Sequence, residues 1–472
     1  MLRWKGASPG RLLALLLAGS WGWMAGPALA AEGSLSLEQA LRLGREHSPA
    51  VQAADARARG AAQLRWEGLG YLLPKVDLQE VAIRSEQPGE VFGLMMNRRE
   101  AVMDLIAANS LMFSQGQPYV ADLVNPDPMN TYITRVTAEM PLFAGGQIVN
   151  RVRQADLMAD AQELKSERER RQVDFDVATA WTNLAKAREY RDLLERARAT
   201  TKAHVEMARD YQDVGFLVAS DVLRAEVQLS QMNELVLRAE NGAALAQAAL
   251  NFQLGLDLRT MHKLEATPAQ PETGDELGAW TEQALGSRPD LAAARKQLKA
   301  GELEEWVAGA AFLPTLGVQA GYDWYDDTAF GTAEGSYSVK AALTFNVFRG
   351  GSDRARFARA RQEYRAGSQD VARFQEGVRL ELQQHWGDLQ TARLSQQAAA
   401  QALTAGRENL RVVEDRFREG VSRMIDLLDA ETALREAEVR ELVARYDGHM
   451  AGFRLRHAAG QEIVKLEEEM SK

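Results

Sequence analysis

The sequence contains two copies of one unit, and this internal repeat limits the possible folds more than any other feature. PLFAGGQ at residues 141–147 returns as NVFRGGS at residues 346–352, an offset of 205 positions. The same offset relates further pairs of positions, namely Val173 and Val378, Trp181 and Trp386, Gly215 and Gly420, and Asp221 and Asp426. The chain is therefore expected to fold into two similar halves.

The first copy is longer than the second. Pro49, Trp66 and Pro74 recur 240 positions later as Pro289, Trp306 and Pro314, whereas the offset beyond the Gly-Gly pair is 205. The difference places an excess of 35 residues between Pro74 and Phe143. This excess is expected to lie in the loop between the first two strands, where a Met- and Leu-rich stretch at 91–113 suggests a short helix or a plug.

Periodicity gives the same order of elements in both copies. Apolar residues at spacings of three and four, with no proline, predict unusually long helices after each Gly-Gly pair, and Gly215 and Gly420 end them. In the first repeat, 31–256, we expect a helix at 37–71, strands at about 75–84 and 131–143, a long helix at 147–213 and a return helix at 219–256. A linker at 257–275 follows. In the second repeat, 276–462, we expect a helix at 276–311, strands at about 315–325 and 336–348, a long helix at 352–418 and a return helix at 424–460. A charged tail at 463–472 ends the chain.

Residues 1–30 have the pattern of a signal peptide, since Arg3, Lys5 and Arg11 precede an apolar run that ends in Ala28-Leu29-Ala30. The chain is therefore expected to be exported. Its net charge of −10 argues against a nucleic-acid partner. There is no cysteine, which excludes disulfides and thiolate metal sites. Residues 31–472 contain no HExxH, GxxxxGK[ST] or GxSxG signature, so we expect neither an enzyme nor a cofactor.

The predicted strands alternate apolar and polar residues, as in Tyr337, Val339, Ala341 and Leu343 against Ser338 and Lys340. Each strand has about ten residues, which is enough for a tilted strand to cross a bilayer. Four strands cannot close a barrel, because small barrels need about eight. Several copies of the chain are therefore expected to share one barrel in contact with lipid.

The two copies, the PLFAGG motif and the glycine turns followed by Asp-Val-Leu and Asp-Leu-Leu-Asp-Ala resemble the TolC family of outer-membrane efflux proteins. The resemblance covers the whole chain after the signal peptide. It implies an α+β membrane protein, a homotrimer with a 12-stranded β-barrel continued by a periplasmic α-helical barrel. It further implies a passive duct that docks onto a periplasmic adaptor and an inner-membrane pump of the RND, ABC or MFS type. Efflux and type I secretion are both compatible with this reading, and the exported substrate stays open.

The resemblance also implies a gate at the inner end of the duct. Asp426 and Asp429 lie three residues apart on one helix face, where three copies would place six carboxylates in a narrow mouth. The alternative for these acids is the favourable position of negative charge at a helix N-terminus. Asp221 occupies the equivalent place in the first copy, where the family has an aspartate that pairs with a basic residue of the neighbouring hairpin and keeps the mouth shut. The family has an arginine at the position of Ser422, and Arg423 is the candidate replacement for it. The family also often has a tyrosine at the position of Phe417.

Two further groups of residues are expected to serve the assembly. The hairpin tips are expected to dock onto the adaptor, and they consist of Val214, Gly215, Phe216, Leu217, Glu419, Gly420 and Val421. The turns from strand to helix contain Gly145, Gly146, Gly350 and Gly351. The aromatic residues near the strand ends are expected to form an interfacial girdle, and they are Tyr71, Phe143, Tyr322, Trp324, Tyr325, Phe330, Tyr337 and Phe348. Lone histidines such as His204 are expected to be solvated or packed.

A second hypothesis is a soluble periplasmic coiled-coil protein that acts as an adaptor or scaffold. It accounts for the long helices, because rods with a narrow apolar stripe pack against neighbouring rods. It does not account for the four alternating runs, or for their return at the same place in both copies. The channel is therefore the preferred hypothesis.

Overall fold

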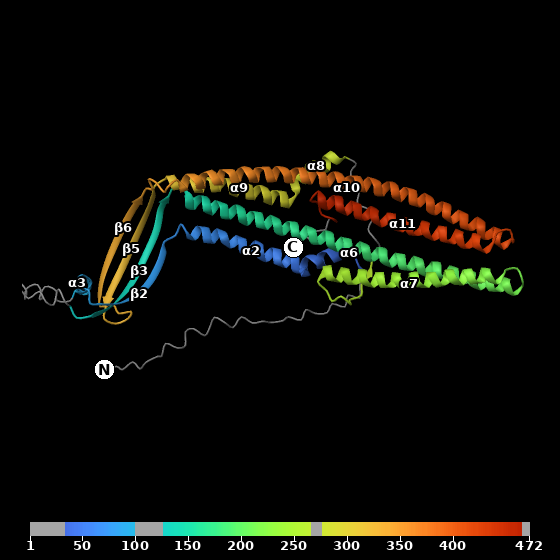
Figure 1. The fold of residues 1–472 in the computed structure, drawn as a ribbon, viewed down its shortest axis with the longest axis horizontal. Coiled ribbons are helices and arrows are strands. Elements are labelled where there is room, and N and C mark those ends of the chain that lie inside the picture. Colours follow the sequence, from blue (N-terminus) through green and yellow to red (C-terminus); the bar gives the residue numbers. More distant parts are fainter. Residues whose placement is uncertain (1–33, 100–125, 266–275, 465–472) are drawn as a thin grey trace, which may run out of the picture.

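The fold was analysed in a computed structural model, which describes residues 34–99, 126–265 and 276–464. A four-stranded sheet lies at one end of an elongated molecule, and two helical hairpin tips lie at the other (Figure 1). The predicted signal peptide, most of the excess in the first copy, part of the linker and most of the charged tail lie outside the described residues. Among the described residues, no helix is both long enough and apolar enough to cross a membrane.

Two helices of 67 residues each run from the sheet to the tips, α6 at Gln147–Asp213 and α10 at Ser352–Arg418. At 1.5 Å per residue each is about 100 Å long. The return helices are α7 at Ala219–Leu254 and α11 at Met424–Ala458. These bounds lie within two residues of those predicted from the sequence, because glycine marks the helix boundaries.

The helices predicted at 37–71 and 276–311 are each divided in two, which the sequence analysis did not predict. The first comprises α1 at Leu37–His47 and α2 at Pro49–Gly70. The second comprises α8 at Leu277–Ser287 and α9 at Pro289–Gly309, followed by the short 3-10 helix η1 at Ala310–Phe312. Ser48 and Arg288 at the two breaks have extended backbone angles. The cause is proline at the next position, which disfavours a helical conformation of the residue before it.

The sheet contains β2 at Lys75–Ser85, β3 at Met129–Ala144, β5 at Thr315–Asp326 and β6 at Glu334–Thr344, in that spatial order and all antiparallel. The last strand is shorter than the predicted 336–348, because its partner β5 begins at Thr315, opposite Thr344. A parallel pair of two-residue strands, β1 at Ser34–Leu35 and β4 at Lys263–Leu264, was not predicted. The first interstrand connection begins with helix α3 at Pro88–Asn97.

The strand register separates an apolar face of the sheet from a polar one. Leu78, Val136, Tyr322 and Tyr337 are aligned across the four strands on the apolar face. On the polar face Lys75, Glu139, Gln319 and Lys340 form a corresponding row. A sheet with one apolar face is suited to contact lipid on that side and water on the other.

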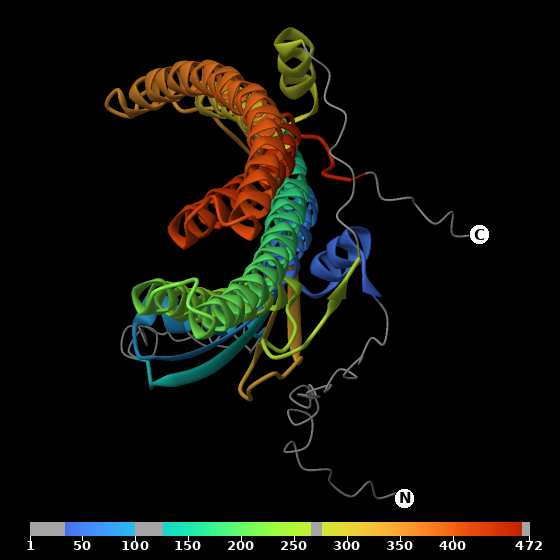
Figure 2. The same ribbon diagram turned by 90° about the vertical axis from the view of Figure 1, so that its right-hand side faces the viewer.

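The long helices form a curved layer (Figure 2). Towards the tips the order across the layer is α7, α6, α11 and α10, and nearer the sheet α2 and α9 take the places of α7 and α11. In each repeat, the return helix and the helix that precedes the strands thus pack one after the other along the same side of the long helix. The layer has α7 and α10 at its two edges near the tips.

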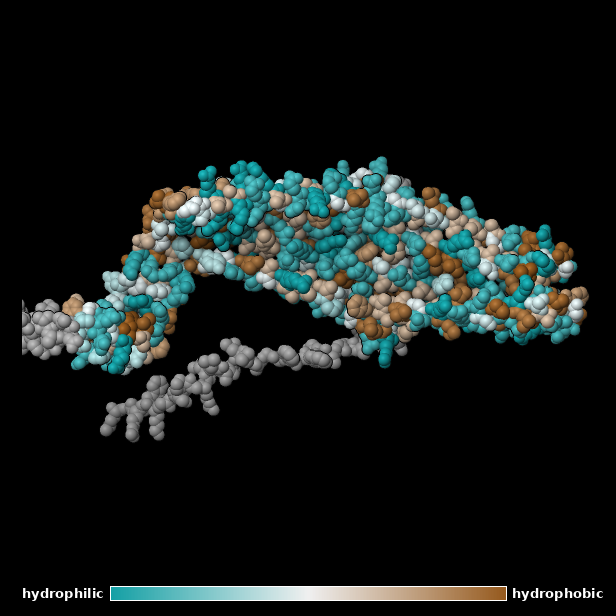
Figure 3. Space-filling view, viewed as in Figure 1, coloured by the Kyte–Doolittle hydropathy of each residue, from teal (hydrophilic) through white to brown (hydrophobic). Residues whose placement is uncertain are grey.

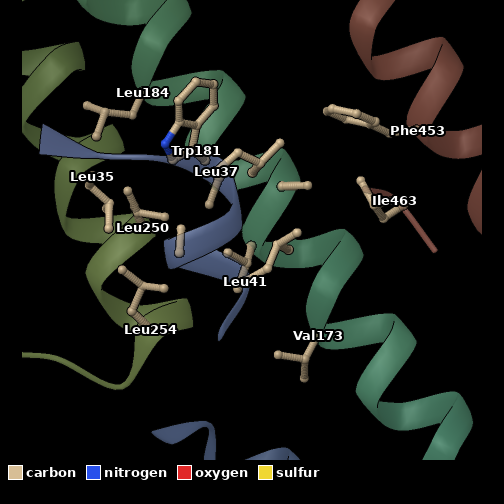
Figure 4. Close-up of a cluster of buried hydrophobic side chains, with 14 of the residues drawn as sticks. Leu35, Leu37, Leu41, Val173, Trp181, Leu184, Leu250, Leu254, Phe453 and Ile463 are labelled. Carbon is tan, nitrogen blue, oxygen red and sulfur yellow. The ribbon is translucent and has the colours of Figure 1, made fainter. Parts of the chain in front are cut away.

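The largest buried cluster surrounds Trp181, which is fully buried between α6, α1 and α7 (Figure 4). Leu41, Leu184, Leu250 and Leu254 pack around it, and Phe453 and Ile463 extend the cluster to the second repeat. Burial of a large apolar side chain contributes about 2–3 kcal/mol to folding. This cluster therefore fixes α1, α6 and α7 at mid-length and ties them to the end of α11.

A charged network lies beside this cluster and joins α9, α10 and α11. The guanidinium of Arg288, only 5% exposed, donates to the Ala458 carbonyl at 2.9 Å, to Glu381 at 2.5 Å and to Asp290 at 2.7 Å. Arg168 Nη1 lies 2.7 Å from Nε2 of His457. Burial and the positive charge of Arg168 lower the pKa of His457 to about 3, so its ring is neutral and accepts this hydrogen bond.

Candidate functional site: the hairpin tips

The two hairpin tips have the same backbone geometry. Gly215 and Gly420 have φ angles of 81° and 78°, in the left-handed region that glycine adopts without strain. The next amide donates back into the ended helix in both tips, from Phe216 to the Tyr211 carbonyl and from Val421 to the Arg416 carbonyl, each at 2.8 Å. The 205-residue repeat thus extends to individual hydrogen bonds.

Apolar side chains are exposed at the tips, and Figure 3 shows apolar residues at this end of the molecule. Phe216 is 82% exposed and Val421 is 73% exposed. Val214 and Val218 are also exposed. Leu217 differs from the prediction of a fully exposed tip, because it packs against the buried cluster behind the turn.

Behind the turns, one apolar cluster joins the two hairpins of the chain. Its buried members are Val205, Ala208, Val222, Ala225, Phe417, Met424, Leu427 and Leu428, which come from α6, α7, α10 and α11. The ring of Phe417 lies 5.9 Å from that of Tyr211. The two tips are therefore held side by side.

The acidic residues predicted at the gate have different surroundings. Asp426 accepts a hydrogen bond from the Arg423 amide at 3.0 Å and one from its guanidinium at 3.3 Å. These two contacts lower the pKa of Asp426. Asp429 is exposed and, within the described part of the chain, forms no ion pair. The carboxylate of Asp429 is thus the less neutralised of the two.

The structure does not bring Asp221 and Arg423 together. Asp221 lies in the first turn of α7, and the guanidinium of Arg423 faces Asp426 of its own helix. In the described ranges no side chain of Arg or Lys forms an ion pair with Asp221. Hence Arg423 does not pair with Asp221 within one chain.

Sequence reasoning missed an ion pair between the hairpins. His204 Nδ1 on α6 lies 2.6 Å from Glu431 Oε1 on α11, and both side chains are largely buried. Burial lowers the pKa of His204 and Arg418 adds to this, but the carboxylates of Glu431 and Glu414 together raise it, and the net shift is upward. The repeat gave no signal for this pair, because Glu226, the equivalent of Glu431, pairs with Arg209 of its own hairpin.

This pair predicts a pH dependence of stability. Because the pKa of His204 is raised in the folded state, the pairing stabilises the protein fully below the ordinary value of about 6.5 and is lost as pH rises through the raised value. We expect the melting temperature of detergent-purified protein, followed by circular dichroism, to fall over this window. The fall should be smaller in Glu431→Gln.

Glu226→Gln is the matched control, because Glu226 pairs with Arg209 at 2.6 Å and arginine does not titrate here. This variant should keep the wild-type pH profile. An unchanged profile in Glu431→Gln would exclude the pair as its source.

The glycine pairs lie where the strands pass into the long helices, as predicted. Gly145 and Gly146 follow β3, and Gly350 and Gly351 precede α10, all four with positive φ. A Cβ atom on Gly145 would also lie only 2.9 Å from the Ala310 carbonyl oxygen. In the second turn only the backbone angles require glycine, because a Cβ atom there would meet nothing within 4 Å.

Most of the aromatic residues predicted for the girdle are exposed, whereas Tyr325 is not. Phe330, Tyr337 and Phe348 are strongly exposed, at 67%, 81% and 80%. Tyr325 is buried, because it points to the polar face of the sheet, where helix α3 covers it. In the described residues no group of three or more His, Asp or Glu side chains is placed to hold a metal ion.

Comparison with known proteins identifies the family. The model of a family described as outer membrane efflux protein matches residues 95–256 and 280–461, one segment in each repeat. The chain belongs to this family.

Relatives in the outer membrane efflux protein family agree with this assignment. The outer membrane efflux protein BepC of Brucella suis is 24% identical over 323 residues, which cover 68% of this chain and 70% of that relative. The outer membrane protein TolC of Vibrio cholerae is 24% identical over 291 residues, covering 60% and 66%. The solved structure of the outer membrane protein VceC of Vibrio cholerae superposes with a TM-score of 0.74 at 18% identity, covering 91% of this chain and 97% of that one.

Family membership confirms the predicted resemblance and location. The chain is an outer-membrane efflux protein with a large periplasmic helical portion, and the family is one of channel proteins. The fold agrees with the prediction of strands continued by long helices in two repeats. The choice between a channel and a soluble scaffold is thereby decided in favour of the channel.

Proposed function

We propose that three copies of this chain form one duct that crosses the outer membrane and reaches into the periplasm. The observation that carries this proposal is the unpaired state of both edges of the sheet. In the described chain, β2 pairs only with β3 and β6 only with β5, so both outer strands have free backbone groups. In lipid such edges must be paired, and joining β6 of one copy to β2 of the next satisfies both.

The helical layer supports the same arrangement. One edge helix, α7, exposes five apolar side chains, Leu223, Val227, Leu237, Leu245 and Phe252. They fall within an arc of about 80° on the helix surface at 3.6 residues per turn. The other edge helix, α10, exposes Leu380 and Leu394. Because the two edges differ, their contact is head to tail, and such contacts form a ring when the rotation from copy to copy closes.

Three copies give twelve strands, above the minimum of about eight for a small barrel. This number also agrees with the trimer implied by the resemblance to the TolC family. The apolar face of the barrel would contact outer-membrane lipid, and the polar face would line the pore.

We further infer that the tips dock onto a periplasmic adaptor, which connects the duct to an inner-membrane pump of the RND, ABC or MFS type. Exposed Phe216 and Val421 support docking, because apolar residues at a hairpin tip gain free energy when a partner covers them. Whether the system serves efflux or type I secretion depends on the pump.

In this assembly Asp426 and Asp429 would ring the periplasmic mouth as a cation-selective gate. We expect Asp429→Asn to lower the ratio of cation to anion permeability severalfold, because its carboxylate has no ion-pair partner within the described chain. Asp426→Asn should have a smaller effect, since Arg423 already offsets that charge. The permeability ratios of both variants are measured as reversal potentials in planar bilayers under a salt gradient.

Glu408→Gln, about three turns from the tip along α10, is the control and should leave selectivity unchanged. If Asp429→Asn has wild-type selectivity, these carboxylates do not line the narrowest part of the mouth.

The assembly itself is tested by extracting the protein from outer membranes in mild detergent and measuring its protein mass by light scattering with detergent correction. A particle of three chains that conducts ions in planar bilayers is expected. A monomer or dimer without conductance would overturn the proposal.

A further inference from the structure

Helix α3 covers an apolar patch on the polar face of the sheet. The patch consists of Val81, Ile83, Ile133 and Tyr325, with Met129 at its margin. The strand register places all five on the same face as Lys75, Glu139, Gln319 and Lys340. Leu94 of α3 packs directly on this patch and is 6% exposed, and Val91 is 3% exposed.

This patch is confined to the end of the sheet farthest from the long helices, where α3 lies (Figure 1). Nearer the helices, the same face carries charged and amide side chains, including the Arg135–Asp323 pair at 2.7 Å. Apolar side chains that face a water-filled pore have no favourable contact there unless something covers them. Among the described strand residues, the pore-side face is therefore apolar only where α3 buries it.

Polar contacts hold the segment across the sheet. At its start, Ser85 on β2 donates a hydrogen bond to Glu90 at 2.5 Å. At its end, Arg98 donates to the Asn130 carbonyl on β3 at 3.3 Å, and Arg99 lies 3.4 Å from Glu334 on β6. The segment 88–99 thus spans the sheet from one edge strand to the other.

We propose that α3 lies inside the barrel and sets the width of its outer mouth, and hence the size of solute that passes. This inference rests on the proposed trimeric duct, in which the polar face lines the pore. A barrel of twelve strands is about 24 Å across between opposite backbones, for strands about 4.8 Å apart and tilted by about 40°. A helix with its side chains is about 10 Å wide. Three such helices inside the barrel would occupy most of this width.

The test is the single-channel conductance of Leu94→Asp in planar bilayers. The new carboxylate cannot remain in the apolar patch without a partner, so α3 should leave the sheet and the outer mouth should widen. We expect conductance to rise, because the outer constriction and the periplasmic mouth add their resistances in series and α3 no longer narrows the outer one. Permeation of a hydrophilic dye too large for the wild-type pore should increase in parallel.

Met96→Asp is the matched control, because it places the same charge on the same helix at a side chain that is 55% exposed. It should leave the large dye excluded, because α3 stays on the sheet. Val91→Ala combined with Leu94→Ala removes the contact without adding charge, and it decides the matter if Leu94→Asp does not assemble. Its conductance should rise by a smaller factor.

The outcomes separate this inference from the proposal on which it rests. If the variants form trimers with wild-type conductance, α3 does not limit the pore, and the trimeric duct stands. If the wild type forms no trimer or no channel, the duct itself fails and the inference fails with it. A trimer that passes the large dye in Leu94→Asp but not in Met96→Asp supports both.

Discussion

Replacing Arg288 with methionine is expected to destabilise the folded protein by about 3 kcal/mol. The side chain is almost fully buried, and its guanidinium joins Asp290, Glu381 and the Ala458 carbonyl. Methionine fills a similar volume. The carboxylates of Asp290 and Glu381 and the carbonyl of Ala458, however, lose the hydrogen-bond donor that Arg288 supplies. The loss of stabilisation should appear as a lower melting temperature of the helical signal by circular dichroism in detergent.

The control for Arg288 is Arg411→Met, which removes an arginine with a similar pair of carboxylate contacts on the exposed surface of α10. Arg411 lies 2.7 Å from Glu408, and both side chains are 61% exposed. Exposed pairs contribute at most about 1 kcal/mol. Equal melting temperatures of the two variants would mean that the buried network is not a source of stability.

Introducing two acids into the apolar stripe of α7 is expected to abolish assembly. In Leu237→Asp combined with Leu245→Asp, two carboxylates would face the neighbouring chain, and each would cost several kcal/mol when removed from water. Within one chain both side chains are exposed, at 65% and 64%, so the fold of the single chain should survive. Light scattering should then report a monomer with wild-type helical content.

Asn233→Asp combined with Ala249→Asp provides the control, because both residues are exposed on α7 but lie outside the arc of the stripe. The doubly substituted chain carries the same added charge and should remain trimeric. A trimer in the stripe variant would show that α7 is not at the interface between copies.

The backbone path along the long helices could be predicted from the sequence, because glycine and proline act locally. Gly215 and Gly420 mark the ends of α6 and α10, and both have the positive φ that ends a helix. Pro49 and Pro289 gave an equally local signal for the breaks after α1 and α8. The apolar pattern, however, continues across both breaks and therefore favours one continuous helix at each place.

Features that depend on partners distant in sequence could not be predicted. Trp181 and Trp386 are equivalent in the repeat, but only Trp181 is fully buried, because Leu37 and Leu41 of α1 cover it. The ion pair of His204 with Glu431 depends on which hairpins lie side by side. Among the gate residues, the contrast between Asp426 and Asp429 arises from the local turn at Arg423. The sequence pattern, which places both acids on one helix face, did not distinguish them.

The uninterrupted length of α10 has a mechanical consequence. From Glu381, where Arg288 holds it, to its end at Arg418, the helix extends by about 55 Å at 1.5 Å per residue. The segment beyond Glu381 is a rigid rod whose support is the charged network around Arg288. A tilt of about 5° at that support displaces the far end by roughly 5 Å, as follows from this length. A small rotation of the α10–α11 hairpin at the Arg288 network would therefore move its tip by several ångströms, without any unwinding of the helix.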